Sequence, residues 1–292
     1  MNKNENVLIR LAHGNGGRLT NRLVNDIFIR HFKNPFIEKA MDAAVFLTGQ
    51  SRLVFTTDTY VIRPLFFPGG NIGKLSICGT ANDCTVMGAR PLYVSCGFVI
   101  EEGFPVLELE KVVISMKEAA SEAGVIIVTG DTKVVEKGKA DNLFINTSGI
   151  GEIETKKINT GNQRINPGDV IIVSGTLGDH AAAVISARKE FPLKLVVESD
   201  AAPLWDMIAP ILEAVPESIK IMRDPTRGGL ATTLNEFVKG TSCSCTIDEK
   251  CLPVRDDVKA LCELAGFDPI YLANEGKIVI VCDPDAQNIV LQ

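Results

Sequence analysis

The amino-acid sequence predicts an α/β fold divided into two domains. Its 292 residues exceed what one ordinary core needs and match two domains of roughly 150 residues each. Short runs rich in β-branched residues alternate with segments of helical periodicity. A polar stretch with turn-forming residues follows Gly151 and separates two such patterns. We assign residues 1–50 to an N-terminal glycine-rich segment and helix, 51–154 to the N-terminal domain and 155–292 to a C-terminal α/β domain.

The N-terminal domain is expected to alternate strands and helices. Its clearest element is a helix that has Pro105 near its start and Gly124 at its end. The apolar side chains of this helix recur on one stripe, at Leu109, Val112, Val113, Met116, Ala120 and Ala123. The other expected elements are a helix over about 71–87 and strands over 53–57, 92–100, 125–129 and 143–150.

The C-terminal domain begins after the turn formers Gly161, Pro167 and Gly168. Helical periodicity and apolar runs predict its elements, which are strands over 169–174 and 277–282 and helices over 179–188, 204–215 and 229–238. The two halves share a rough architecture without any repeat of a fixed short period.

Composition and charge exclude several classes of protein. With 46% apolar residues, each half can bury a core, so disorder is not expected. The net charge of -6 and the lack of a dense Lys/Arg block argue against nucleic acid as a partner. No apolar run suits a signal peptide or a membrane span, so we expect a cytoplasmic protein. The eight cysteines lack the spacing of secreted domains, and most are expected to be reduced and buried.

Three acidic residues, Asp58, Asp83 and Asp131, stand where a strand or helix is expected to meet a loop. Asp58 and Asp131 directly follow β-rich apolar runs, and α/β folds place ligands beyond the carboxyl ends of strands. Carboxylates gathered there are oxygen ligands suited to Mg²⁺ that bridges nucleotide phosphates. On the predicted helix, Ser76, Gly79 and Asp83 share one small, polar face. The alternative is that Gly79 serves only close packing and that Asp83 caps a turn.

Two further clusters combine glycine with charged and hydroxyl groups. The first, Gly130–Lys133, directly follows an apolar strand and can serve both phosphate and metal; the alternative is a solvated turn. The second, Arg223–Gly229, precedes a helix, so its glycines can bring backbone N–H groups near an anion. Asp224 or Thr226 can equally be a plain helix N-cap.

A nucleotide, if bound, is expected to use an unusual cradle. The glycine-rich run His13–Arg18 precedes a helical segment and can either fold over phosphates or form a mobile terminus. The sequence has no P-loop motif, and the segment Gly70–Lys74 resembles one only superficially. No G-x-G-x-x-G motif follows a strand either.

Several distinctive motifs are spread along nearly the whole chain. They are LAHGNGGR, FTTDTYVIRPLFFPGGNIGKLSICGTANDCTVMGARPLY, EEGFP, VTGDTKVV, LFINTSGIG, VSGTLGDH, RDPTRGGLA and LANEGKIVI. Together they resemble the motifs of the HypE family of hydrogenase-maturation carbamoyl dehydratases. The family belongs to a superfamily with aminoimidazole ribonucleotide synthetase, selenophosphate synthetase and thiamine-monophosphate kinase, all of which bind ATP without a P-loop. The segment PLFFPGGNIGKL together with GDTKVV is typical of HypE rather than of those relatives.

The resemblance implies a fold, a cofactor and a set of site residues. It implies a homodimer in which the N-terminal domains, here residues 51–154, join their sheets into an intersubunit β-barrel and bind Mg-ATP between the two domains of each subunit. The implied Mg²⁺ and phosphate ligands are Asp58, Asp83, Asp131 and Asp224. The implied supporting nucleotide contacts are Lys74, Gly130, Thr132, Lys133 and Asn146. Glu275 and Lys133 match the residues that handle protons, and the alternative for Glu275 is a solvated loop acid.

The resemblance also implies a reaction and its partners. The carbamoyltransferase HypF loads a carbamoyl group onto a C-terminal cysteine, ATP activates the carbamoyl oxygen, and loss of the amide protons yields a thiocyanate. That product supplies the cyanide ligand of the iron in nickel–iron hydrogenase through the HypC–HypD complex. This sequence stops at Val290–Gln292 without the Pro-Arg-Ile-Cys tail of the family. We therefore expect a truncated C-terminal domain that binds nucleotide but forms no thiocyanate.

Two other functions compete with this interpretation. A selenophosphate-type phosphotransferase needs a reactive residue near the N-terminus, whereas the first cysteine is Cys78, inside a predicted helix. A nucleotide-binding scaffold that assembles HypC and HypD without catalysis predicts slow ATP turnover that does not depend on Asp58 or Asp131.

Cysteine and histidine offer a weaker metal signal. Cys243, Cys245 and Cys251 form C-x-C-x₅-C, which is not a zinc-ribbon spacing and has no histidine nearby. Cys245 and Cys251 are expected to pack as small apolar residues. His180 is expected to cap or pack a helix, and His13 is a weak phosphate-loop residue.

Overall fold

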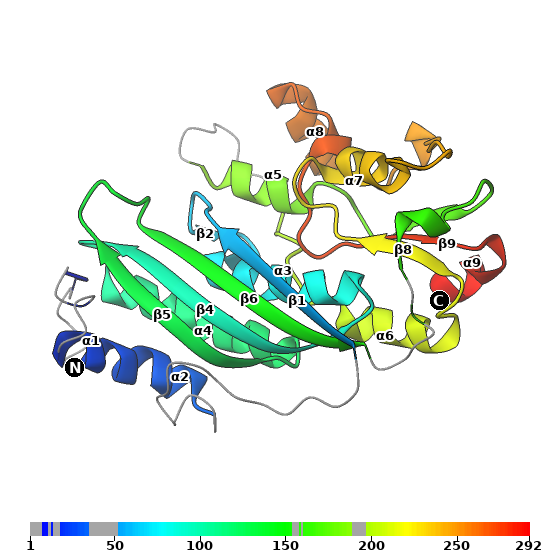
Figure 1. The fold of residues 1–292 in the computed structure, drawn as a ribbon. Coiled ribbons are helices and arrows are strands. Elements are labelled where there is room, and N and C mark those ends of the chain that lie inside the picture. The colour runs from blue at the N-terminus through cyan, green and yellow to red at the C-terminus, as the bar shows by residue number, and fades with distance from the viewer. Residues whose placement is uncertain are drawn as a thin grey trace.

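The chain folds into two α/β units in the computed structural model, which describes residues 8–10, 13, 18–34, 52–153, 158, 160–188 and 197–292. Figure 1 shows a long sheet with helices behind it and a smaller unit with its own sheet beside one end. Among the described residues, no helix combines the length and apolar character needed to cross a membrane.

A mixed sheet forms the N-terminal unit. Its strand order is β1-β6-β4-β5, with β1 at Arg52–Tyr60, β6 at Leu143–Ile153, β4 at Arg90–Glu101 and β5 at Ile126–Val135. Strand β6 runs antiparallel to both of its neighbours, whereas β4 and β5 are parallel. Because parallel strands need a crossover, α4 (Val106–Glu122) connects β4 to β5 across one face of the sheet. Helix α3 (Ile72–Val86) covers the same face beside it (Figure 1).

Helix α3 is apolar or small on nearly all sides because it packs on the sheet, beside α4 and against the C-terminal unit. It begins at Ile72, since the Asn71 side chain accepts hydrogen bonds from the backbone N–H of Gly73 at 2.8 Å and of Lys74 at 3.3 Å. Just before it, β2 (Phe66–Phe67) and β3 (Gly70–Asn71) form a small hairpin.

A helical segment near the N-terminus packs across α4. It consists of α1 (Arg18–Leu23), the π-helical turns of η2 (Val24–Ile29) and α2 (Arg30–Phe32). Arg30 forms an ion pair with Glu110 of α4, and His31 Nε2 lies 3.3 Å from the same carboxylate. The glycines of the run His13–Arg18 lie outside the described residues.

An antiparallel sheet with the order β7-β9-β8 forms the centre of the C-terminal unit, with β7 at Val170–Val173, β9 at Val279–Cys282 and β8 at Ile219–Arg223. Both faces are buried, which explains the continuous apolar run of β9. Ile280 packs in one core with α6 (Trp205–Ala214) and α9 (Gln287–Val290), and Val279 and Val281 pack in another with α7 (Gly229–Val238). The remaining elements are α5 (Asp179–Ser186), α8 (Asp256–Ala265) and the 3-10 turns Asn162–Arg164, Glu249–Cys251, Pro269–Tyr271 and Pro284–Ala286.

The structure confirms both predicted helices of the N-terminal domain and corrects two strands. Strand β5 was expected to end at residue 129, but it continues through Gly130–Lys133, because its pairing with β4 persists as far as Glu101 and Val135. Strand β1 likewise extends past the expected end to Tyr60. The sequence reasoning missed β8 and α8 altogether. The proposed domain boundary near residue 154 falls beside residues that the structure does not describe, and it stays a prediction.

All eight cysteines are free thiols, and five of them are buried: Cys78, Cys84, Cys96, Cys262 and Cys282. Cys243 and Cys245 are partly buried, as expected for Cys245. Cys251 is exposed, so the expectation that it packs as an apolar residue was wrong. It occupies a surface 3-10 turn instead of the core.

Candidate functional site

Asp58 and Asp83 face each other where β1 packs on α3. Alternate residues of β1, including Thr56 and Asp58, point toward the helix, so strand alternation rather than a loop places Asp58. Thr56 Oγ1 donates a 2.7 Å hydrogen bond to Asp83 Oδ2. Asp83 lies inside α3 and does not cap a turn, which removes that alternative. The expectation that Asp58 follows its strand was wrong, since the ladder to β6 continues beyond it.

Small residues on α3 allow β1 to pack closely against this helix. A Cβ on Gly79 would lie 2.3 Å from Tyr60 Oη, so this position must be glycine for the tyrosine to fit. The Tyr60 hydroxyl lies 3.4 Å from Thr80 Oγ1, which is 2.5 Å from Thr147 Oγ1 of β6. The packing role expected for Gly79 is therefore confirmed, and it supports the polar face that carries Asp83.

Asp224 adds a carboxylate from the C-terminal unit. It directly follows β8 and lines, together with Asp83, a cavity of about 630 Å³ between the two units. This volume lies within the usual range of ligand pockets. The rest of the lining is mainly apolar and includes Val54, Phe55, Val86, Met87, Ile221 and Met222. The N-cap alternative for Asp224 and Thr226 was wrong, because α7 begins later, at Gly229, with Gly228 at the cap position.

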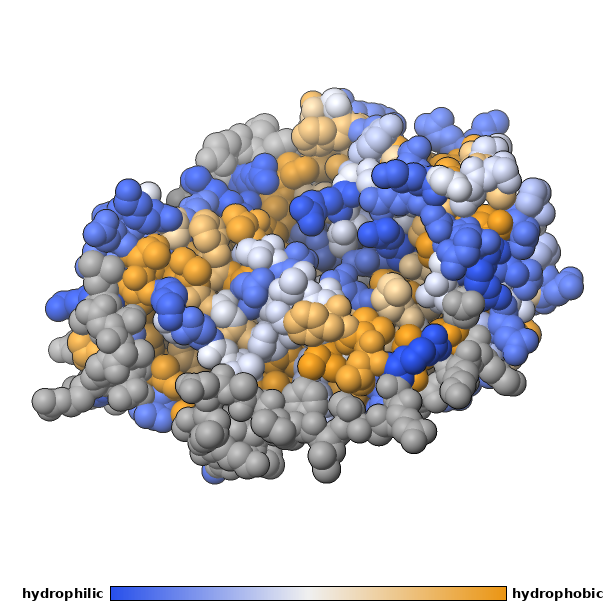
Figure 2. All heavy atoms as spheres, viewed as in Figure 1, coloured by the Kyte–Doolittle hydropathy of each residue, from blue (hydrophilic) through white to orange (hydrophobic). Residues whose placement is uncertain are grey.

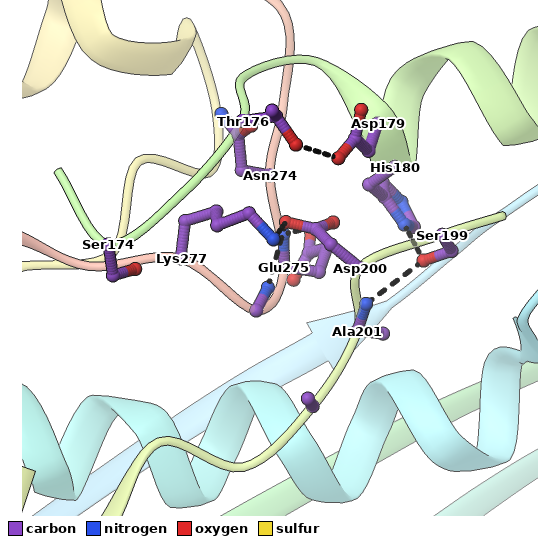
Figure 3. A network of polar contacts seen from close by, with 12 residues as sticks. Ser174, Thr176, Asp179, His180, Ser199, Asp200, Ala201, Asn274, Glu275 and Lys277 are labelled. Carbon is purple, nitrogen blue, oxygen red and sulfur yellow. Dashed lines mark hydrogen bonds and ion pairs between the residues drawn. The ribbon is translucent and has the colours of Figure 1, made fainter. Parts of the chain in front are cut away.

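Glu275 approaches from the turn that precedes β9. Figure 3 shows this turn beside the segment that carries Asp200. The backbone carbonyl of Glu275 accepts a 3.2 Å hydrogen bond from Asn82 Nδ2 of α3, which ties the turn to the helix that carries Asp83. Glu275 is partly buried and feels the charges of the three aspartates named above, so it is not a solvated loop acid.

These carboxylates raise one another's pKa. Burial, reinforced by the charge of Asp83, raises the pKa of Asp224 to about 7. Burial also raises the pKa of Asp83, with a further contribution from Asp58 and an opposing hydrogen bond from Thr56. The pKa of Glu275 lies well above its ordinary value, first through burial and then through the charge of Asp224. The cluster therefore concentrates negative charge that a bound cation would stabilise.

Asp131 and Lys133 lie on the opposite face of the sheet. Their side chains are 68% and 65% exposed and form an ion pair of 2.7 Å. The hydrogen bond from Lys133 holds the pKa of Asp131 below its usual range. Both belong to strand β5, so the alternative of a solvated turn was wrong for this segment. Within one chain, the structure does not bring Asp131 together with the other three aspartates.

The remaining predicted nucleotide contacts divide between the two faces. Asn146 is exposed on β6, and its Nδ2 donates a hydrogen bond of 2.9 Å to the backbone carbonyl of Asp58. Thr132 alternates with Asp131 and points to the helix-covered face. Gly130 permits close strand packing, because a Cβ there would lie 2.4 Å from the carbonyl oxygen of Cys96.

Lys74 lies in the first turn of α3, at the other end of the helix from Asp83. The two residues are nine positions apart in the sequence, which corresponds to about 13 Å along the helix axis. The Nζ of Lys74 lies 3.4 Å from the backbone carbonyl of Gly69, over the hairpin that precedes the helix. Lys74 is thus apart from the acidic cluster.

The acidic cluster fits the way in which Mg²⁺ binds with a nucleotide. Among the residues that the structure describes, no three acidic, histidine or cysteine side chains stand close enough to hold a metal by themselves. Magnesium in nucleotide sites usually takes one or two carboxylates and completes its shell with phosphate oxygens and water. Asp83 and Asp224, which line the same cavity from two units, meet that requirement.

Sequence reasoning missed two residues of this region. Thr56 holds the Asp83 carboxylate, and Asp200 holds the backbone beside Glu275. The helix periodicity carries no signal for either, since both contacts join segments distant in sequence. His180, by contrast, packs as expected, with its ring edge-on to Phe67 at 5.4 Å.

Both halves of the chain match known protein families. Residues 40–153 match the AIR synthase related protein, N-terminal domain, and residues 166–292 match the AIR synthase related protein, C-terminal domain. The chain is 48% identical over 288 residues to the carbamoyl dehydratase HypE of Escherichia coli K12, a match that covers 97% of this chain and 85% of that protein.

Solved structures of HypE proteins have the same fold as this chain. A crystal structure of hydrogenase maturation protein HypE in complex with ATP superposes with a TM-score of 0.92 at 47% identity, covering 97% of this chain and 83% of the other. A crystal structure of a HypE–HypF complex superposes with a TM-score of 0.80 at 48% identity, covering 92% of this chain and 87% of the other.

Proposed function

The chain belongs to the HypE family of carbamoyl dehydratases within the AIR synthase related proteins, and from that membership we propose that its site converts a thiol-bound carbamoyl group, presented on a C-terminal cysteine, to a thiocyanate with the help of ATP. It acts in hydrogenase maturation, where the product supplies the cyanide ligand of the iron. The observation that carries the proposal is the group of carboxylates, Asp58, Asp83, Asp224 and Glu275, which two domains bring together beside an open cavity.

The reaction needs an activated leaving group and a proton acceptor. The carbamoyl oxygen attacks the γ-phosphorus of ATP, and ADP leaves. The carbon–oxygen bond then breaks with loss of phosphate, and the nitrogen gives up its two protons as the carbon–nitrogen triple bond forms. The sum is one thiocarbamate and one ATP converted to one thiocyanate, ADP, hydrogen phosphate and one proton, so that phosphate keeps one of the two amide protons and the other is released. Glu275, close to the acidic cluster, is suited to accept one of these protons.

ATP is proposed to bind in the cavity between the two domains. A homologue at 47% identity has been crystallised with ATP. The apolar wall around Val86, Ile221 and Met222 can receive the base, while Asp83 and Asp224 face the phosphates. Bound Mg²⁺ would neutralise phosphate charge between these carboxylates. Lys74 and Thr132 are proposed as further nucleotide contacts.

A homodimer is proposed to complete the site. The sheet face that carries Asp131 and Lys133 also exposes Phe55, which is 71% exposed, and Leu53, which is 47% exposed. Figure 2 shows apolar side chains gathered over this sheet. Pairing two such faces into a barrel would bury them. Asp131, Lys133, Gly130 and Asn146 would then serve the nucleotide across the interface, which accounts for their distance from the other aspartates.

Partners follow from the chemistry of the substrate. A homologue has been crystallised with HypF, and we propose that a HypF-type carbamoyltransferase supplies the carbamoyl group to this protein in the cytoplasm. A HypC–HypD complex is the proposed acceptor of the cyanide group.

The test joins the chain to a family-type tail that ends in cysteine; we call this the tailed chain. It is loaded by a HypF-type transferase, purified and then given Mg²⁺ and ATP. The expected result is the loss of one water mass from the carbamoylated protein, measured by intact mass spectrometry. A carbamoyl adduct that persists while ATP is hydrolysed would overturn the proposal.

A further inference from the structure

A buried carboxylate near the site belongs to Asp200, in the segment between α5 and α6. Its side chain is only 3% exposed. We propose that Asp200 is a positioning residue that holds the turn carrying Glu275, and so orients the Glu275 carboxyl for proton transfer. This inference rests on the proposed role of Glu275 and adds a residue that acts through it.

Asp200 binds three successive residues of that turn (Figure 3). Its Oδ1 accepts a hydrogen bond from the backbone N–H of Glu275 at 3.2 Å, and its Oδ2 accepts one from the N–H of Gly276 at 3.3 Å. The ammonium of Lys277 lies 3.4 Å from Oδ2. Every one of these partners is a donor, so the position requires two acceptor oxygens, which a carboxylate supplies and an amide does not.

Close backbone contact between the Asp200 segment and the Glu275 turn restricts how the turn can move. A Cβ on Gly276 would lie 1.7 Å from the carbonyl oxygen of Asp200, so the turn can approach only because residue 276 is glycine. Asn274 fixes the start of the turn, since its Nδ2 donates a hydrogen bond of 3.1 Å to the backbone carbonyl of Pro225, the residue directly after Asp224. The turn is therefore bound on both sides of Glu275.

The Asp200 segment is in turn anchored to the N-terminal unit. The backbone N–H of Ser199 donates a hydrogen bond of 2.8 Å to the backbone carbonyl of Pro68. Asn82 donates to the carbonyl of Ala202 at 2.9 Å and to that of Glu275 at 3.2 Å. Because Asn82 precedes Asp83 on α3, one helix places both the phosphate-facing carboxylate and the support for Glu275.

The test replaces Asp200 with asparagine in the tailed chain. Asp200→Asn keeps the shape but turns an amide toward an N–H donor. Misplacement of a reacting group by about 1 Å can cost about 100-fold in rate, so we expect kcat for dehydration to fall by about 10- to 100-fold. The KM for ATP should stay within about twofold, because the hydrogen bonds and ion pair of the Asp200 side chain to described residues all go to the turn. A normal kcat in a folded variant would overturn the inference.

A matched control separates positioning from stability. Asp283→Asn breaks another partly buried ion pair, with Lys220 at 2.6 Å, at the opposite end of strands β8 and β9 from Asp224 and Glu275. We expect it to lower the melting temperature and leave kcat unchanged. If both variants lose kcat in proportion to their melting temperatures, Asp200 is merely structural and the inference fails.

A double-mutant cycle with Glu275→Gln identifies the route of action. If Asp200 works through Glu275, adding Asp200→Asn to Glu275→Gln causes little further loss. Independent, multiplied losses would overturn the inference. If Glu275→Gln alone keeps full kcat, the proposed role of Glu275 fails instead, which distinguishes the two. Should Asp200→Asn not fold, the same cycle is run with Lys277→Met, whose side chain is 15% exposed and which removes one partner of Asp200.

Discussion

At the scale of single residues, a cluster of carboxylates defines the site. Asp83, Asp224 and Glu275 share one region, and burial raises the pKa of each. Folding tolerates such a cluster at a cost in stability, because each ionised carboxyl loses solvation and repels its neighbours. Residues that weaken a fold in this way are common at functional sites.

Asp83→Asn should abolish Mg-dependent ATP hydrolysis without lowering the melting temperature. The amide can still accept the hydrogen bond from Thr56 Oγ1, but it no longer offers a charge to a metal or phosphate. Loss of such electrostatic stabilisation typically costs about 100-fold or more in rate. ATPase rate and melting temperature are measured together, with Asp256→Asn, whose side chain is fully exposed, as the control. Unchanged turnover in Asp83→Asn would remove Asp83 from the site.

Asp224→Asn should stabilise the metal-free protein, and more so at high pH. The folded pKa of about 7 exceeds the ordinary value of 3.8, so the folded state binds the extra proton between these values and loses stability as pH rises through them. The neutral amide avoids that loss, which is about 2 kcal/mol after allowance for partial exposure. Denaturant melts with a chelator at pH 5 and pH 8 test this. An equal effect at both pH values contradicts the assigned cause.

At the scale of elements, the contact between β1 and α3 decides where the aspartates stand. Strand alternation turns Thr56 and Asp58 toward the helix, and glycine in the helix provides the space. Two elements that fit this closely cannot slide without moving the carboxylates.

Gly79→Ala tests that contact. Alanine normally stabilises a helix interior by about 1 kcal/mol relative to glycine. Here its Cβ would lie 2.3 Å from Tyr60 Oη, so we expect a net loss of about 1–3 kcal/mol of unfolding free energy. Adding Tyr60→Phe removes the hydroxyl and should restore part of the stability, which chemical denaturation measures. A stabilised Gly79→Ala protein would show that the contact is loose.

At the scale of the whole molecule, the arrangement of faces argues for a dimer. One face of the long sheet is covered by α3 and α4, and the other exposes apolar side chains together with Asp131 and Lys133. The two edge strands of this sheet are β1 and β5.

Phe55→Glu should convert the dimer to a monomer at micromolar concentration, since it places a charge on the exposed sheet face. ATP hydrolysis should fall in both Phe55→Glu and Leu53→Glu if Asp131 acts across the interface, since Leu53 lies on the same face as Phe55 and is not part of the cavity lining. Leu264→Glu is the control, because Leu264 is 69% exposed, close to the 71% of Phe55, but lies on α8 of the C-terminal unit. Light scattering and ATPase rate decide; a Phe55→Glu protein that stays dimeric contradicts the proposed barrel face.

The sequence by itself determined what depends on local pattern. Caps and periodicity predicted α3 and α4 closely, because hydrogen bonds between near neighbours define a helix. Motif resemblance identified the family and named Asp83, Asp224 and Glu275. The local pattern did not predict β8, because this short strand contains the charged residue Lys220. Lys220 can be buried there because it forms an ion pair with Asp283, which lies far away in the chain.

Only the tertiary structure decided which side chains meet. Asp58 and Asp131 look alike in the sequence, each after a β-rich run, yet they stand on opposite faces of one sheet. Their faces depend on strand pairing, since a shift of one residue reverses every side chain, and no local pattern specifies that register. The buried contacts of Asp200 have the same origin, because they join a loop and a turn about 75 residues apart that only the tertiary folding of the C-terminal unit brings together.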